Sequence, residues 1–143
     1  MFIENPVESE VLLTTEESST WLLDSGASYH VTPHRSQFRQ YSDRHSDSVR
    51  VGNSQHCAII GIGTVELNFP GGSTLVLLNV RHVPELSRPL ISVRQLDEAG
   101  IRAGFSSGGW TLHRGNLLLA RGPKVHSLYP LYVTLRERVA YFW

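Results

Sequence analysis

Residues 21–28 read Trp21-Leu22-Leu23-Asp24-Ser25-Gly26-Ala27-Ser28, an apolar run that stops at an acid and is followed by a turn of small residues. Three consecutive apolar residues predict a short strand with both faces buried. A carboxylate at the end of such a strand costs free energy of desolvation unless it gains a partner or a function. Gly26 permits a backbone conformation, or a close approach of another chain, that residues with a Cβ resist. We therefore expect Asp24 to have a partner or a function that compensates for its burial.

Length and composition indicate one globular domain. The chain has 143 residues, of which 41% are hydrophobic, enough for one core. Its single cysteine, Cys57, excludes an intramolecular disulfide and a cysteine-based zinc cluster. The sequence contains no run of about eighteen apolar residues that would cross a membrane. It also lacks the basic start and apolar segment of a signal peptide. We therefore expect a cytoplasmic protein without membrane contact.

The charge of the chain is zero overall but unevenly distributed. Residues 1–80 carry nine acidic and four basic side chains, whereas residues 81–143 carry four acidic and nine basic ones. The simpler interpretation is ordinary surface charge, with no direct nucleic-acid site. The alternative, a C-terminal half that faces RNA or an acidic partner, stays open.

The rest of the chain predicts short strands and a single helix. Residues 1–19 are acidic and suit a linker or a terminal strand. Alternation and turn residues predict a β-hairpin with its tip near Asn53 and Ser54, whose second strand runs over residues 57–69. Further strands are expected over 73–82, 101–105, 110–112, 117–120 and 129–135, and an amphipathic helix over 90–99 ending at Gly100. This pattern favours a small all-β barrel or sandwich.

The chain contains a single Asp-Ser-Gly, and this limits the chemistry that Asp24 can perform. Hydrolysis of a peptide by aspartates needs two carboxyl groups about 3 Å apart that share one proton. One chain can supply only half of such a pair, so a protease of this kind has to be a symmetric homodimer. Ser25 could then hydrogen-bond across the two-fold axis, and Gly26 could donate its N–H to Asp24. The simpler interpretation of the tripeptide is a surface turn.

Several separated motifs resemble the protease region of copia-type retrotransposon Pol polyproteins, including plant elements of the TNT kind. The resemblance begins with the 21–28 stretch, His30 and Phe38 and runs to about Tyr132. The further motifs that carry it are Val51-Gly52-Asn53, Gly61-Ile62-Gly63, Val80-Arg81-His82-Val83-Pro84-Glu85-Leu86 and Leu90-Ile91-Ser92.

This resemblance implies a retropepsin-like fold, a small β-barrel with a hairpin flap and one short helix. It implies Asp24 as the catalytic residue, with Ser25, Gly26 and Ala27 supporting the active-site loop. The flap implied by the resemblance includes Gly52, Asn53, Ser54, Gly61 and Gly63. Retropepsins commonly carry Gly-Arg-Asn before the short helix, and Ser87-Arg88-Pro89 is aligned there. Arg88 is therefore expected to support the contact between subunits, although Pro89 cannot donate a backbone N–H.

The implied function is an aspartic endopeptidase that processes the Gag-Pol polyprotein as a homodimer, in the cytoplasm or in virus-like particles. No cofactor or metal is expected. The protease core would span residues 20–100, followed by a C-terminal β extension over 101–135 toward the pre-integrase region and a tail over 136–143. The alternative is a non-catalytic β-barrel module of a degenerate or domesticated element, because the same fold can persist without activity.

Two other kinds of site fit the sequence poorly. His30 and His34 have the spacing of a helical metal pair, and Cys57 follows His56, but no second cysteine completes a zinc site and Pro33 interrupts a helix. A serine hydrolase would need the Gly-x-Ser-x-Gly elbow, which Ser25 lacks.

Overall fold

The computed structural model describes residues 20–43, 47–50 and 56–134. The fold is all-β, as the sequence predicts, with one short α-helix in this part of the chain. The predictions for residues 1–19 and 136–143 concern residues outside the described ranges. The elements are β1 (Thr20–Asp24), β2 (Val31–Thr32), the 3₁₀ helix η1 (Arg35–Gln37), β3 (Phe38–Ser42), β4 (Asp47–Arg50), β5 (His56–Ile59), β6 (Gly61–Asn68), β7 (Thr74–His82), β8 (Leu90–Ser92), α2 (Val93–Glu98), β9 (Ile101–Ser106), β10 (Gly109–Arg114), β11 (Leu117–Pro123) and β12 (Pro130–Tyr132).

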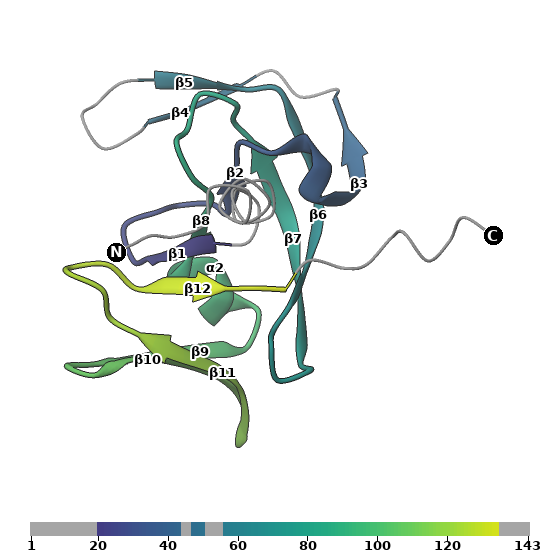
Figure 1. Ribbon diagram of the computed structural model, residues 1–143. Coiled ribbons are helices and arrows are strands. Elements are labelled where there is room, and N and C mark those ends of the chain that lie inside the picture. The colour runs from purple at the N-terminus through teal and green to yellow at the C-terminus, as the bar shows by residue number, and fades with distance from the viewer. Residues whose placement is uncertain (1–19, 44–46, 51–55, 135–143) are drawn as a thin grey trace, which may run out of the picture.

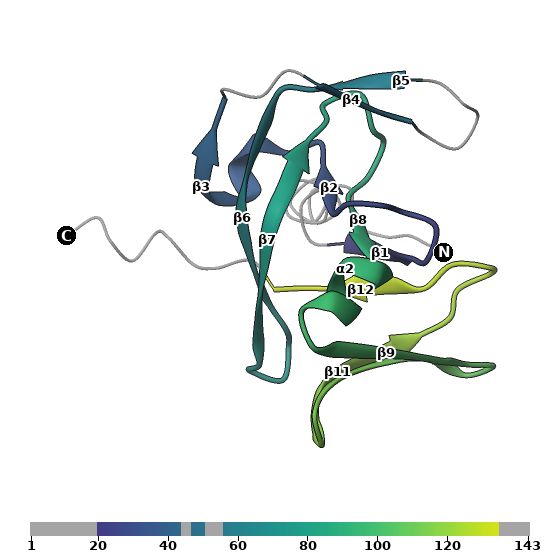
Figure 2. The same cartoon turned by 180° about the vertical axis from the view of Figure 1, so that it is seen from behind.

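Seven of these strands form one sheet in the order β12-β1-β8-β2-β7-β6-β3. Strands β1 and β8 are parallel, as are β2 and β7. Figures 1 and 2 show the β4–β5 hairpin at one end of the described fold and the three-stranded sheet β9–β10–β11 at the other, with β1, β8 and β2 between them. The strand that ends at Asp24 therefore lies in the middle of the fold.

Side chains of β1 alternate between two environments. Trp21 and Leu23 are 0% and 7% exposed and join the main hydrophobic cluster. Leu22 and Asp24 point to the opposite face and are only partly buried. The sequence predicted burial on both faces, which is wrong for the second face, because it borders a groove. The two-residue period of a strand places Leu22 and Asp24 together on that groove.

The predicted long strand over residues 57–69 is interrupted at Ile60. Its first part, β5, pairs with β4 in the hairpin, and its second part, β6, pairs with β7 and β3 in the large sheet. Gly61 and Gly63 therefore lie in β6 and not in the hairpin, which ends at Ile59.

Packing explains both glycines of β6. A Cβ on Gly61 would overlap the Tyr41 ring, and one on Gly63 would overlap the backbone oxygen of Gln40. They allow β3 to cross close over β6, a role that the sequence could not assign.

The predicted helix over residues 90–99 is shorter than expected. Leu90–Ser92 form β8, which pairs with β1 and β2, and α2 begins at Val93 with Ser92 as its N-cap. The oxygen of the Ser92 side chain accepts a hydrogen bond from the Gln95 N–H at 3.1 Å. Leu96 is the buried residue of this helix.

Residues 101–134 pack onto the same hydrophobic cluster as the preceding strands. Trp110 and Leu112 are 3% and 0% exposed, and the Trp110 indole N–H donates to the Pro130 carbonyl oxygen at 2.8 Å. Strand β12 then pairs with β1, with Trp21 opposite Leu131. The predicted boundary near residue 100 lies between α2 and β9. None of the described helices is long and apolar enough to span a membrane.

Candidate active site

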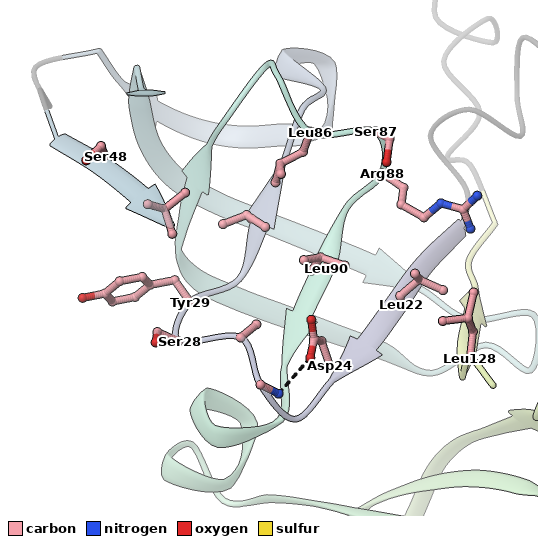
Figure 3. Close-up of a pocket in the computed structure, with 14 residues that line it drawn as sticks. Leu22, Asp24, Ser28, Tyr29, Ser48, Leu86, Ser87, Arg88, Leu90 and Leu128 are labelled. Atoms are coloured by element: carbon pink, nitrogen blue, oxygen red, sulfur yellow. Dashed lines mark hydrogen bonds between the residues drawn. The ribbon is translucent and has the colours of Figure 1, made fainter. Parts of the chain in front are cut away.

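A groove of about 930 Å³ lies beside the end of β1. Leu22 and Asp24 form part of its floor, and residues of the turn that follows Asp24 form one side. The hairpin contributes Ser48 and Val49, while the loop between β7 and β8 contributes residues 86–88. Figure 3 shows the Asp24 carboxylate near the middle of this lining, with Leu90 and Leu22 beside it. The groove is therefore mainly apolar, with a carboxylate inside it, as ligand sites commonly are.

The Asp24 carboxylate is oriented by its own turn. Its Oδ1 atom accepts a hydrogen bond from the Gly26 N–H at 2.8 Å, drawn as a dashed line in Figure 3. This is the bond that the sequence predicted for Gly26. Asp24 itself is partly buried, whereas Ser25 and Gly26 are exposed at the tip of the turn. A second molecule can therefore reach the tip without displacing any part of the described chain.

The turn is held from behind by the start of α2. The Ser92 hydroxyl donates to the Ala27 carbonyl oxygen at 2.8 Å, and the Arg94 guanidinium donates to the Ser28 carbonyl oxygen at 2.6 Å. Ser92 also lies directly opposite Asp24 in the parallel pairing of β1 and β8. These contacts fix the backbone on which the Asp24 carboxylate is mounted. We call Ala27, Ser28, His30, Ser92, Arg94 and Gln95 the loop clasp.

His30 is one of two buried members of the loop clasp, together with Ser92. Its Nδ1 accepts a hydrogen bond from the Ser92 N–H at 3.0 Å, and its own N–H donates to the Gln95 side-chain oxygen at 2.7 Å. Burial, and to a lesser degree the Arg81 charge, lower the pKa of His30 from 6.5 to about 4. The imidazole is therefore neutral at pH 7, with its proton on Nε2. The sequence analysis named His30 as part of the family resemblance and as a poor candidate for a metal ligand, and it missed this structural role.

The hairpin predicted as a flap covers one side of the groove. Strands β4 and β5 pair from Asp47–Ile59 to Arg50–His56, and Ser48 and Val49 line the groove. The predicted tip residues Gly52, Asn53 and Ser54 lie outside the described residues. The described hairpin ends at Ile59, so it is shorter than the sequence predicted, because Gly61 and Gly63 belong to β6. Its role as a flap stays a prediction.

Arg88 lies in the loop before β8 and not at the start of the helix. The three residues of β8 separate this loop from α2, so Ser87-Arg88-Pro89 precedes the helix as predicted, but not directly. Pro89 is buried, and its carbonyl oxygen accepts from the Leu22 N–H at 3.1 Å. The missing N–H of Pro89 therefore does not affect the helix. The Arg88 side chain lines the groove, and its predicted contact between subunits stays a prediction.

The described residues offer neither a metal site nor a cysteine nucleophile. They contain no group of three or more His, Cys, Asp or Glu side chains placed to hold a metal ion. Cys57 is buried, and burial together with the Glu85 carboxylate raises the pKa of its thiol. A thiol with a raised pKa is a weak nucleophile at pH 7.

Among the described residues that line the groove, Asp24 is the only acid. A single carboxylate can accept a proton from water, but it cannot at the same time donate one to a substrate carbonyl. None of the other described lining residues carries a carboxyl group that could act as this donor. The exposed tip of the turn leaves Asp24 accessible to a group from outside the described residues.

Comparison with known proteins gives two matches. The family model described as Pol polyprotein, beta-barrel domain, matches residues 21–101, from β1 to the first residue of β9. The retrovirus-related Pol polyprotein from transposon TNT 1-94 of Nicotiana tabacum is 38% identical over 122 residues, which is 85% of this chain. The aligned region spans only 9% of the tobacco protein.

Proposed function

Since this chain belongs to the family of Pol polyprotein β-barrel domains, and is such a domain of a copia-type retrotransposon polyprotein, we propose that it acts as an aspartic endopeptidase. Its substrate would be the Gag-Pol polyprotein, and its active form a homodimer with one Asp24 from each chain. It would work in the cytoplasm or in virus-like particles.

One observation carries this proposal, the placement of Asp24. Its carboxylate lies in a groove of about 930 Å³, at the end of a core strand, on a turn whose backbone is hydrogen-bonded to α2. Apolar walls and an oriented carboxylate suit an extended peptide better than a small polar ligand. A surface turn without function would need neither the groove nor the loop clasp.

The chemistry follows from placing a second Asp24 beside the first. Two carboxyl groups at about 3 Å share one proton, because both cannot be ionised at that distance. The ionised one takes a proton from a water molecule as it attacks the scissile carbonyl carbon, while the protonated one donates to the carbonyl oxygen. As the C–N bond of the tetrahedral intermediate breaks, the leaving nitrogen takes up the proton held by the pair, and one hydroxyl group of the intermediate returns a proton to the pair. The products are an amine and a carboxylic acid, and the two carboxyl groups again share one proton.

The neighbouring residues would support this pair. The Gly26 N–H holds one oxygen of each Asp24 and leaves the other directed at the groove. The exposed Ser25 hydroxyl can hydrogen-bond to the partner chain and align the two turns. The β4–β5 hairpin would cover the bound peptide and exclude water, which strengthens the electrostatic interactions in the site.

The proposal is tested by cleavage of peptides that span junctions of the element's own Gag-Pol polyprotein, at mildly acidic pH. Wild-type protein should cleave, Asp24→Asn should not, and Asp43→Asn, which changes an exposed acid outside the groove, should cleave as wild type does. Equal cleavage by wild type and Asp24→Asn would exclude Asp24 as the catalytic residue. A folded wild-type protein that binds these peptides without cleaving them would support the alternative of a non-catalytic module.

A further inference from the structure

The described lining of the groove contains two charged side chains of opposite sign. Among the described residues that line it, Asp24 is the only acid and Arg88 the only base, and all others are uncharged. Figure 3 shows Arg88 extending from the loop between β7 and β8 at the end of the groove near Leu22, on the opposite side from Tyr29. A peptide lying across Asp24 would therefore pass a single guanidinium at this end.

The backbone of Arg88 is held in place, and its guanidinium has no ion-pair partner among the described residues. The next residue, Pro89, is buried and bonded to β1 through its carbonyl oxygen, so the backbone at this point is held in place. The Arg88 side chain is exposed and makes no ion pair with a described carboxylate. The acid closest to it in sequence, Glu85, acts on the Cys57 thiol, whose pKa its carboxylate helps to raise. The guanidinium can thus bind a carboxylate that the described chain does not supply.

The other end of the groove, near Tyr29, has no described acidic side chain that would balance the positive charge of Arg88. The Arg81 guanidinium lies over the Tyr29 ring at 3.8 Å and donates to the Asn79 carbonyl oxygen at 2.7 Å. It is not ion-paired with a described carboxylate either. Basic groups therefore lie at or just behind both ends of the groove, whereas the one acid among its described lining residues is Asp24, the proposed catalytic residue.

We propose that Arg88 is a specificity-determining residue that selects peptides with a glutamate or aspartate side chain near the cleaved bond. This inference rests on the proposed function, because it assumes that the groove binds a peptide. An arginine accepts a carboxylate through two parallel N–H···O bonds, and apolar walls on Leu22 and Leu90 reduce competition from water. Because the guanidinium is partly in solvent, we expect about a fivefold preference for Glu over Gln.

The test uses a positional library of dodecapeptides in which one position at a time is Glu, Gln or Lys and the others are mixed. Wild type should cleave the Glu pool about fivefold faster than the Gln pool at one position. Arg88→Gln should lose this preference, and Arg88→Glu should prefer Lys at the same position. Arg102→Glu, which makes the same charge change at an exposed site on β9 outside the groove, should keep the wild-type pattern.

An unchanged Glu preference in both Arg88 variants would overturn the inference. Sedimentation of each variant distinguishes a loss of the dimer from a change in the preference for Glu. If Arg88→Glu does not fold, the result for Arg88→Gln decides whether Arg88 selects Glu. If no protein cleaves any pool, the proposed function fails, and binding of the fluorescein-labelled pools to the same variants is measured by anisotropy. If wild type binds the Glu pool more tightly than the Lys pool and the Arg88 variants do not, Arg88 selects acidic peptides even though the chain is not a protease. Equal binding of both pools by wild type overturns the inference.

Discussion

The loop clasp gives the most quantitative prediction, through replacement of Ser92 by alanine. The Ser92 hydroxyl makes two hydrogen bonds, accepting from the Gln95 N–H at 3.1 Å and donating to the Ala27 carbonyl oxygen at 2.8 Å. Loss of a serine N-cap costs about 1 kcal/mol. Loss of the partner of a partly buried carbonyl costs about 1 kcal/mol more. Ser92→Ala should therefore lower the free energy of unfolding by about 2 kcal/mol.

Urea unfolding at pH 7, followed by tryptophan fluorescence at one fixed protein concentration, measures this loss. With a urea m-value of about 2 kcal/mol/M, the midpoint should fall by about 1 M. The fixed concentration matters because a dimer is stabilised by mass action. Ser106→Ala removes an exposed hydroxyl at the end of β9 and should change the free energy of unfolding by less than about 0.5 kcal/mol. A loss in Ser92→Ala no larger than in this control would refute the role of Ser92 in holding the turn.

Three further predictions concern single contacts. The pKa of His30 is about 4 in the folded chain, against 6.5 for the free side chain, so the unfolded chain binds a proton at this histidine more readily. The free energy of unfolding should therefore fall by about 3 kcal/mol as the pH is lowered from 6.5 to 4. Urea unfolding across this range should show a smaller loss in His30→Asn, and an equal one would contradict the assignment. Gly63→Ala should destabilise β6 by about 1–3 kcal/mol, whereas Gly71→Ala, with open space around its Cβ, should stay within about 0.5 kcal/mol, as thermal unfolding can compare. Tyr41→Phe removes the 2.7 Å bond to His82 Nδ1 and should cost about 1 kcal/mol in the same assay, and no change would exclude that bond as a stabilising contact.

Local patterns in the sequence were enough to locate the elements around Asp24. The apolar run ending at an acid predicted β1, and the strands expected over residues 73–82, 110–112 and 117–120 correspond to β7, β10 and β11. Each of these signals depends on residues close together in the chain. The Gly26 N–H bond to Asp24 spans two residues and could be predicted for the same reason.

Contacts between distant segments could not be predicted in this way. Leu90, Val93 and Leu96 have helical spacing, yet Leu90 lies in β8, because pairing with β1 and β2 outweighs a weak local preference. The bonds that link His30 to Ser92 and Ser92 to Ala27 join residues 62 and 65 positions apart. No local pattern reports such contacts, so the loop clasp was missed. Leu22 was predicted buried for a similar reason, since only the folded chain shows that the groove borders it.

The central claim is that two copies of Asp24 act together, and mixing two proteins tests it most directly. Wild type and Asp24→Asn are combined at fixed total concentration, allowed to exchange subunits, and assayed for peptide cleavage. If both carboxyl groups are needed, activity follows the square of the wild-type fraction, and an equimolar mixture keeps about one quarter of it. A linear decrease, with about one half of the activity left in the equimolar mixture, would show that each chain works alone and would contradict the account.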